Sequence, residues 1–246
     1  MELRDFFRQH PKAALAFSGG VDSAYLLWAA RDCGAQVLPI FVKTPFQPEF
    51  ELRDARRLCG QLRVQLRVVE QELPDCVLEN PQNRCYLCKH ALFGCLWNAA
   101  REAGYDLLLD GTNASDDPAD RPGMQALAEL EVLSPLRLCG LTKEEIRERS
   151  REAGLFTWDK PAYACLATRF PAGTAITEAG LSKVETAENL LFSLEFTDFR
   201  VRYFAGAARI QVPLGQMSRL LEQREAILTA LRGDFRGVFL DLEGRP

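Results

Sequence analysis

Short apolar runs alternate with helical patterns through the first two thirds of the chain, and this alternation restricts the fold more than any other feature. We predict strands at 13–17, 37–42, 64–69 and 106–110, and helices at 24–33, 50–62 and 86–103. Strands separated by helices pair in parallel through right-handed crossovers. The sequence therefore predicts a doubly wound α/β sheet whose ligand binds at the carboxyl ends of the strands.

The pattern changes after about residue 155. Residues 157–177 are rich in Pro, Gly and Ala and lack periodicity, and long irregular segments of this kind are usually functional. Beyond them we predict helices at 178–194 and 217–231, a hairpin of 199–204 with 207–212, and a last strand at 238–242. The expected organisation is an α/β domain at 1–156, an active-site loop at 157–176, and a smaller α+β domain at 177–246.

Composition excludes some classes of protein. Thirty basic against 34 acidic residues give a net charge of −4, which argues against a nucleic-acid backbone as the main partner. Apolar runs stay too short for a membrane span, and the first ten residues lack the apolar region of a signal peptide. We therefore expect a cytoplasmic protein whose eight cysteines are buried, catalytic or metal-binding rather than disulfide-linked.

One hexapeptide follows the first predicted strand and opens the first predicted helix: Ser18, Gly19, Gly20, Val21, Asp22 and Ser23. Glycines let the backbone approach a ligand closely, and a helix N-terminus offers N–H groups and a positive dipole end. The two serine hydroxyls add donors. An ordinary strand–helix turn with a serine cap is the alternative, but the whole hexapeptide in this context favours binding of a pyrophosphate.

Polar residues also follow two other strands at the same predicted edge of the sheet. They are Lys43 and Thr44 after the second strand, and Gly111, Thr112, Asn113, Asp116 and Asp117 after the fourth. Carboxylates beside phosphates are natural Mg²⁺ ligands. Asp22 and Asp117 are therefore candidate ligands, with a helix cap and a solvated loop residue as the respective alternatives.

Three of the eight cysteines stand in unusual places. Cys85 and Cys88 form a C-x-x-C at the start of a helix, and Cys165 lies in the irregular segment, four residues before Arg169. Such a pair can bind a metal or act in redox chemistry. Arg169 is placed to depress the thiol pKa or to hold a substrate anion. Three thiolates are too few for a closed zinc site, but they suit a [4Fe–4S] cluster with one open iron.

The hexapeptide resembles the PP-loop of the ATP pyrophosphatases, and further motifs narrow the resemblance. They occur in order: Asn83-Arg84-Cys85-Tyr86, Cys88-Lys89, Asp110-Gly111-Thr112-Asn113, Arg121-Pro122-Gly123, Ser134-Pro135-Leu136, Trp158-Asp159-Lys160-Pro161 through Arg169, Arg200-Val201-Arg202 and Ala208-Arg209-Ile210. Together they are similar to the ATP-dependent sacrificial sulfur transferases, the LarE family. The resemblance implies an adenine nucleotide alpha-hydrolase-like fold, ATP and Mg²⁺ as cofactors, and formation of AMP and pyrophosphate.

The family's substrate is a pyridinium biscarboxylate mononucleotide, thiolated on the way to the nickel-pincer cofactor of lactate racemase. Carried over residue by residue, Cys165 is the sulfur donor, and Lys43 and Thr44 lie where such proteins hold the adenosine. Arg200 and Arg202 alternate on a strand and resemble the pair that grips the substrate phosphate, and Glu188 resembles a metal ligand. Gln211 departs from an acidic family position, which puts a second metal site in doubt. We assign catalysis to Asp22, Lys89, Cys165 and Arg169.

Two sulfur sources are open. The Cys165 thiolate can be sacrificed and left as dehydroalanine, or Cys85, Cys88 and Cys165 can hold a cluster that carries hydrosulfide from sulfide or cysteine. We favour the cluster, because Cys85 and Cys88 are otherwise unexplained.

The alternative functions are a tRNA thiolation enzyme, an amidating synthetase, and a non-catalytic ATP or iron–sulfur regulator. Family habit and an exposed second domain suggest a homo-oligomer.

Overall fold

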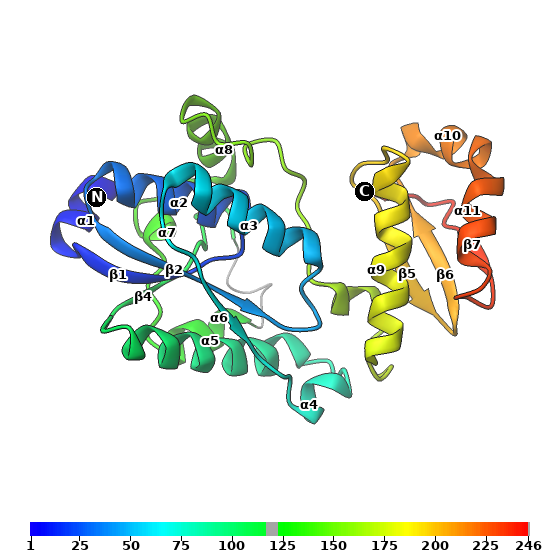
Figure 1. Cartoon of the computed structure of the whole chain (residues 1–246), viewed down its shortest axis with the longest axis horizontal. Coiled ribbons are helices and arrows are strands. Elements are labelled where there is room, and N and C mark those ends of the chain that lie inside the picture. The colour runs from blue at the N-terminus through cyan, green and yellow to red at the C-terminus, as the bar shows by residue number, and fades with distance from the viewer. Residues whose placement is uncertain (117–122, 246) are drawn as a thin grey trace. The chain divides into compact units, whose positions relative to one another are not determined.

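The computed structural model describes residues 1–116 and 123–245, and Figure 1 shows its course. The chain divides into two compact units. The first consists of Met1–Val77 and Asn83–Lys160, and the second of Leu78–Gln82 and Pro161–Pro246. Over the described ranges, no helix combines the length and the apolar character needed to cross a membrane.

A four-stranded parallel sheet forms the centre of the first unit. Its strands are β1 (Lys12–Ala16), β2 (Gln36–Lys43), β3 (Arg67–Glu70) and β4 (Leu108–Leu109), in the spatial order β3-β2-β1-β4. Ala14 pairs with Leu38 on one side and with Leu108 on the other. The doubly wound α/β prediction is confirmed. Residues 64–66 lie outside β3, so the third strand is shorter than predicted.

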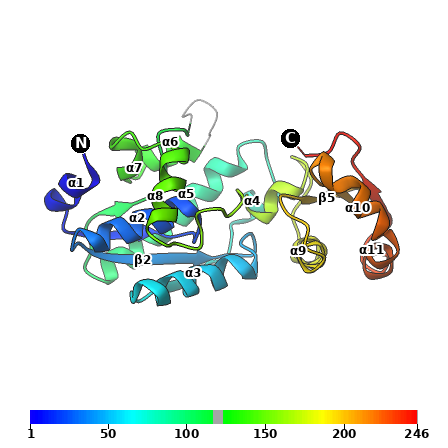
Figure 2. The same ribbon diagram turned by 90° about the horizontal axis from the view of Figure 1, so that it is seen from above.

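Helices cover both faces of this sheet, and Figure 2 shows α3 and α5 on opposite sides of β2. The helices are α1 (Leu3–Gln9), α2 (Val21–Asp32), α3 (Glu49–Leu62), α4 (Asp75–Leu78), α5 (Arg84–Glu102), α6 (Gly123–Glu129), α7 (Pro135–Leu138) and α8 (Lys143–Glu152). Leu15 and Phe41 pack with α1, α2, α3, α7 and α8, whereas Ala14 and Ile40 pack with α5 and α6. Alternate side chains along a strand point to opposite faces, so the sheet is apolar on both.

The second unit packs helices on a three-stranded sheet. Its elements are η1 (Leu166–Arg169), α9 (Glu178–Ser193), β5 (Arg200–Phe204), β6 (Ala207–Gln211), η2 (Leu214–Gln216), α10 (Met217–Glu222), α11 (Arg224–Leu231) and β7 (Val238–Leu240). β5 and β6 are antiparallel, as the predicted hairpin requires, and β7 runs parallel to β6. Leu191 of α9, Leu220 of α10 and Ile227 of α11 share one core with Val201 and Ile210.

The prediction of one helix over 217–231 is wrong, because the chain breaks at Gln223. That residue has φ −90° and ψ 6°, so it ends α10 and caps the start of α11. The break lets two short helices bury Leu220 and Ile227 in the same core. Helical spacing in the sequence continues through the break, which is why periodicity alone did not reveal it.

Residues 78–82 belong to the second unit although they precede α5 of the first. The fully buried Asn80 fixes this segment, because its Nδ2 donates to the carbonyl oxygens of Pro171 (2.7 Å) and Thr174 (3.0 Å). Its own carbonyl accepts the Gly173 N–H at 2.8 Å. The chain therefore passes between the units three times, once on each side of 78–82 and once after Lys160.

Candidate active site

The PP-loop, residues 18–23, forms the turn between β1 and α2. Gly19 has φ +70°, and a Cβ there would lie 3.1 Å from the backbone nitrogen of Ala55, so both conformation and space require glycine. The Ser18 and Ser23 hydroxyl oxygens are 3.2 Å apart, and Ser18 Oγ accepts the Gly20 N–H at 3.3 Å. The two serine hydroxyls therefore lie beside the N–H groups of the first turn of α2, a twelve-residue helix. These hydrogen-bond donors can bind a phosphate group.

Asp22 links the PP-loop to two other segments of the first unit. Asn113 Nδ2, from the loop after β4, donates to Asp22 Oδ1 at 3.2 Å. Lys143 Nζ donates to Asp22 Oδ2 at 2.5 Å. The Asp22 side chain is 23% exposed, so solvent and ligands can reach it. The structure therefore brings together two residues predicted from the sequence, Asp22 and Asn113, and adds Lys143, which was missed.

Lys143 is the first residue of α8, and a capping box in the sequence marks the start of this helix. Thr142 and Glu145 form a capping box, in which the Thr142 N–H donates to Glu145 Oε2 (2.8 Å) and the Glu145 N–H to Thr142 Oγ1 (3.3 Å). This box could have predicted the beginning of α8. The pairing of Lys143 with Asp22, 121 residues away, has no comparable signal.

The loop after β4 packs closely on the start of α2. A Cβ on Gly111 would lie 3.0 Å from the backbone nitrogen of Ser23, so glycine permits this approach. Asp110 is buried and accepts hydrogen bonds from Ser134 Oγ (2.6 Å) and the Thr112 hydroxyl. Burial raises the pKa of Asp110, although these hydrogen bonds oppose the change. Asp110 and Thr112 therefore anchor the loop that holds the buried Asn113 beside Asp22.

Lys43 and Thr44 lie at the carboxyl end of β2, as expected, but both bond to the turn that follows. Lys43 Nζ donates to the Gln47 carbonyl oxygen at 2.5 Å and pairs with Glu49 at 2.6 Å. The buried Thr44 hydroxyl donates to Gln47 Oε1 at 2.7 Å. In this structure the two residues shape the β2–α3 connection.

The C-x-x-C pair and Lys89 lie in the first turns of α5. Cys85 is exposed and Cys88 is half-buried, and their spacing of three residues makes them neighbours on the helix surface. Lys89 passes over Gly123, where a Cβ would lie only 2.4 Å from Lys89 Cδ. Burial raises the pKa of Asp110, and the Lys89 charge opposes this change.

Metal ligands predicted from the sequence do not gather in the described structure. Across residues 1–116 and 123–245, no group of three or more His, Cys, Asp or Glu side chains is arranged to hold a metal ion. Asp117 lies outside the described residues. Cys85 and Cys88 belong to the first unit and Cys165 to the second. The three-thiolate cluster therefore stays a prediction from the sequence.

Cys165 immediately precedes the short helix η1 in the second unit. The thiol residue is half-buried, whereas Leu166 and Ala167 after it are fully buried. The Cys165 carbonyl oxygen accepts the Thr168 N–H at 3.0 Å and the Thr168 hydroxyl at 2.8 Å. Arg169 NH1 donates to the carbonyl oxygens of Ala164 (3.1 Å) and Cys165 (3.5 Å). The backbone on both sides of the thiol is therefore fixed.

Arg169 and Glu188 form a buried ion pair. Arg169 is 1% exposed, and its Nε and NH2 donate to Glu188 Oε1 (2.8 Å) and Oε2 (3.0 Å). Glu188 Oε1 also accepts the Val201 N–H at 2.9 Å, and Oε2 accepts the Tyr163 hydroxyl. Burial lowers the pKa of Arg169, but the bonds and charge of Glu188 outweigh it and the pKa is raised. With both carboxylate oxygens occupied by donors, Glu188 differs from the expected metal ligand.

Arg200 and Arg202 extend from β5 toward the same segment of chain. Arg200 NH2 donates to the Ala162 carbonyl oxygen at 2.7 Å, and Arg202 NH1 to that of Thr168 at 3.0 Å. Burial and the nearby Arg169 lower the pKa of Arg200 to about 10, and the same two causes lower that of Arg202. An added anion would stabilise both charged side chains.

Gln211, at the position where an acid was expected, completes this arrangement on β6. Its Oε1 accepts from Arg202 Nε at 2.6 Å, and its Nε2 donates to Asp241 Oδ2 at 2.6 Å. An amide can serve Arg202 and Asp241 at once, because it has both an acceptor and a donor. The departure from the family pattern therefore has a structural role here.

Comparison with known proteins places the chain among sulfur-transferring enzymes. An uncharacterized protein of Synechocystis is 37% identical over 249 residues, covering 98% of this chain and 92% of its own. The pyridinium-3,5-bisthiocarboxylic acid mononucleotide synthase of Lactiplantibacillus plantarum is 30% identical over 95% of this chain and 86% of its own. A tRNA-specific 2-thiouridylase of Clostridium botulinum is 26% identical over 60% of this chain and 51% of its own. No protein-family model matches.

The PP-loop lies in the first strand–helix turn of a parallel α/β sheet. This fold and these relatives together define an ATP-dependent, sulfur-transferring enzyme of the PP-loop superfamily. Within that superfamily the chain belongs to the LarE family, the family of the pyridinium-3,5-bisthiocarboxylic acid mononucleotide synthase.

Proposed function

We propose that this enzyme converts a carboxylate of a pyridinium biscarboxylate mononucleotide into a thiocarboxylate at the expense of ATP, in the making of a nickel-pincer cofactor. The observation that carries the proposal is the extent of similarity to the mononucleotide synthase, 95% of this chain, which takes in the second unit with Cys165 and its arginines. The match to the tRNA enzyme covers only 60%.

The first step activates the carboxylate. A carboxylate oxygen attacks the α-phosphorus of ATP, the bond to the β-phosphate breaks, and pyrophosphate leaves an acyl adenylate. PP-loop N–H groups and hydroxyls stabilise the charge that develops on the phosphates. Asp22 would hold Mg²⁺, which would leave its present partner Lys143 available to the phosphates. Bound Mg²⁺ would supply further neutralisation of the phosphate charge.

The second step transfers sulfur. In the sacrificial route, the Cys165 thiolate attacks the activated carbonyl carbon and AMP leaves, giving a thioester. Loss of the Cys165 Cα proton and cleavage of its Cβ–S bond then release the thiocarboxylate and leave dehydroalanine. In the other route, Cys85, Cys88 and Cys165 would hold a [4Fe–4S] cluster, which would supply hydrosulfide to displace AMP. The sequence favours this second source, because Cys85 and Cys88 are otherwise unexplained.

Substrate recognition is assigned to Arg200 and Arg202. Both guanidinium groups donate to backbone carbonyl oxygens, and both have lowered pKa values. A phosphate dianion would form stronger hydrogen bonds with these two groups than the carbonyl oxygens do, because both partners would then be charged.

Replacing Arg202 with alanine should raise the KM for the mononucleotide roughly 10- to 100-fold and the KM for ATP hardly at all. Pyrophosphate release measured while each ligand is varied checks this. Arg219→Ala, which removes an arginine bonded to the Leu194 carbonyl of the same unit, is the control. Equal effects on both KM values would remove Arg202 from the substrate site.

tRNA thiolation remains a second candidate because of the thiouridylase relative. A tRNA substrate requires several phosphate contacts, and binding through them weakens steeply with salt. The net charge of −4 does not favour such a surface. Pyrophosphate release stimulated by unmodified tRNA, and not by the mononucleotide, would favour this candidate.

A further inference from the structure

A continuous set of buried polar contacts surrounds the backbone of Cys165 in the second unit. Arg169 holds the carbonyl oxygens of Ala164 and Cys165, and its NH1 also donates to Thr168 Oγ1 at 2.7 Å. Arg169 is 1% exposed, and its guanidinium donates to four oxygen atoms in addition to the Cys165 carbonyl at 3.5 Å. In this conformation the guanidinium is therefore not accessible to a substrate. Its action on Cys165 goes through the backbone.

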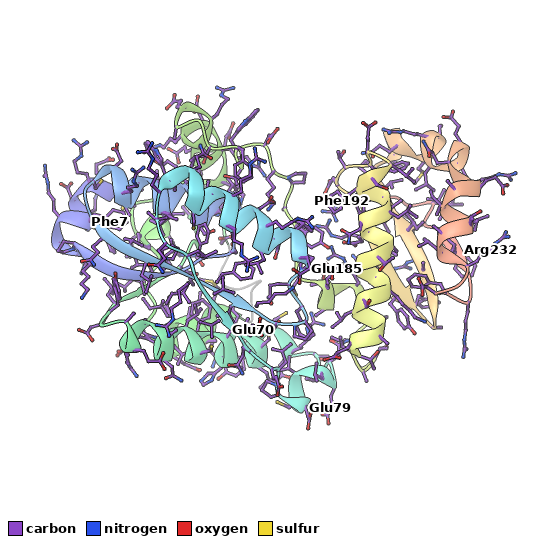
Figure 3. All side chains as sticks on the ribbon, viewed as in Figure 1. Phe7, Glu70, Glu79, Glu185, Phe192 and Arg232 are labelled. Carbon is purple, nitrogen blue, oxygen red and sulfur yellow. The ribbon has the colours of Figure 1, made fainter. Side chains whose placement is uncertain are left out.

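Glu188 is the centre of this set. From α9 it bonds Arg169 through both carboxylate oxygens, accepts the N–H of Val201 on β5, and accepts the hydroxyl of Tyr163. Figure 3 marks Glu185 and Phe192, which precede and follow it on α9. One carboxylate thus ties a helix and a strand to both ends of the segment 163–169 that carries Cys165. Tyr163 also lies under the guanidinium groups of Arg169 and Arg200, with distances to its ring centre of 4.6 and 5.2 Å.

We propose that Glu188 and Tyr163 are positioning residues that hold Cys165 in place for sulfur transfer, with Arg169 as the intermediary. The inference rests on the proposed function for the meaning of Cys165, and it replaces the expected metal role of Glu188. A segment with little regular structure needs such fixation, since an error of about 1 Å in a reacting atom can cost roughly 100-fold in rate.

Tyr163→Phe tests the proposal with the least disturbance, because it removes the hydroxyl bond to Glu188 and keeps the ring. We expect pyrophosphate release to change by less than about twofold and thiolated product to fall about tenfold or more. Cys165 should be alkylated by iodoacetamide about threefold faster or more, since a loosened segment opens locally. Peptide-level mass spectrometry reports the rate relative to the exposed Cys76 of the same molecule.

Lys183→Met is the matched control, because it removes a bond from the same helix to the Asp234 carbonyl (2.8 Å) without touching 163–169. It should leave the alkylation ratio and both activities at wild-type values. Glu188→Gln should lower product formation and raise the alkylation rate of Cys165 more than Tyr163→Phe does. If Glu188→Gln does not fold, Tyr163→Phe still tests the proposal.

Wild-type product formation and an unchanged alkylation ratio in Tyr163→Phe would overturn the proposal. Failure of the proposed function would look different: the wild-type protein itself would release no mononucleotide-dependent pyrophosphate, while the alkylation ratio would still respond.

Discussion

Asp22→Ala is expected to reduce ATP-dependent pyrophosphate release by about 100-fold or more, because it removes the group placed to hold Mg²⁺ against the phosphates. The fold should survive. In the free protein, Asp22 makes a 2.5 Å ion pair with Lys143 whose side chains are 23% and 35% exposed, and such pairs contribute roughly 0–1 kcal/mol to the free energy of unfolding. Pyrophosphate release and thermal unfolding, measured on the same preparation, check both halves of the prediction.

Glu102→Ala is the matched control for Asp22. It removes a comparable ion pair, with Arg67 at 2.5 Å, from the end of α5 in the same unit. It should therefore match the small stability change of Asp22→Ala and retain pyrophosphate release. Wild-type pyrophosphate release by Asp22→Ala would show that Asp22 is not part of the active site. A lower unfolding temperature in Asp22→Ala, but not in Glu102→Ala, would show that Asp22 has a structural role.

Alanine variants of Cys85, Cys88 and Cys165 separate the two sulfur sources. If the three thiolates hold a cluster, each variant should lose iron and sulfur transfer together, because a three-thiolate site fails when any ligand is removed. ATP binding should persist, since the PP-loop belongs to a separate segment. Iron and sulfide analysis of anaerobically purified protein is the accompanying measurement.

The sacrificial route predicts a different result from the same variants. Only Cys165→Ala should be inactive, and the wild-type protein should lose the mass of one H₂S as product forms, because elimination leaves dehydroalanine. Intact-protein mass spectrometry before and after one turnover records this change. An unchanged mass with many turnovers excludes the sacrificial route, and a mass loss with fully active Cys85 and Cys88 variants excludes the cluster. Cys76→Ala, an exposed cysteine outside both sets, should behave as wild type.

Local patterns made much of the fold predictable. β1, β2 and β4 are apolar runs that contain buried residues. The turn of residues 18–23 between β1 and α2 has Gly19 where backbone conformation and space demand glycine. These features depend on residues that are neighbours in sequence or one helical turn apart, so periodicity and turn chemistry report them. The parallel pairing of the strands followed from the alternation of strands with helices.

Long-range polar pairing was not predictable in the same way. Glu188 and Arg169 are charged residues of types that usually lie at the surface, and nothing in their spacing shows that both are 1% exposed and paired. The ion pair of Lys143 with Asp22 joins segments 121 residues apart. A family resemblance named Glu188 as important, but only the contacts around it indicated what it holds.

ATP-dependent thiolation of a carboxylated pyridinium mononucleotide can be measured directly. The protein is incubated with ATP, Mg²⁺ and the biscarboxylate mononucleotide, and AMP, pyrophosphate and the mass of the mononucleotide are followed together. We expect one AMP and one pyrophosphate for each oxygen replaced by sulfur, and no pyrophosphate without the mononucleotide. ATP cleavage that leaves the mononucleotide unchanged in mass while another acceptor is thiolated would contradict this expectation.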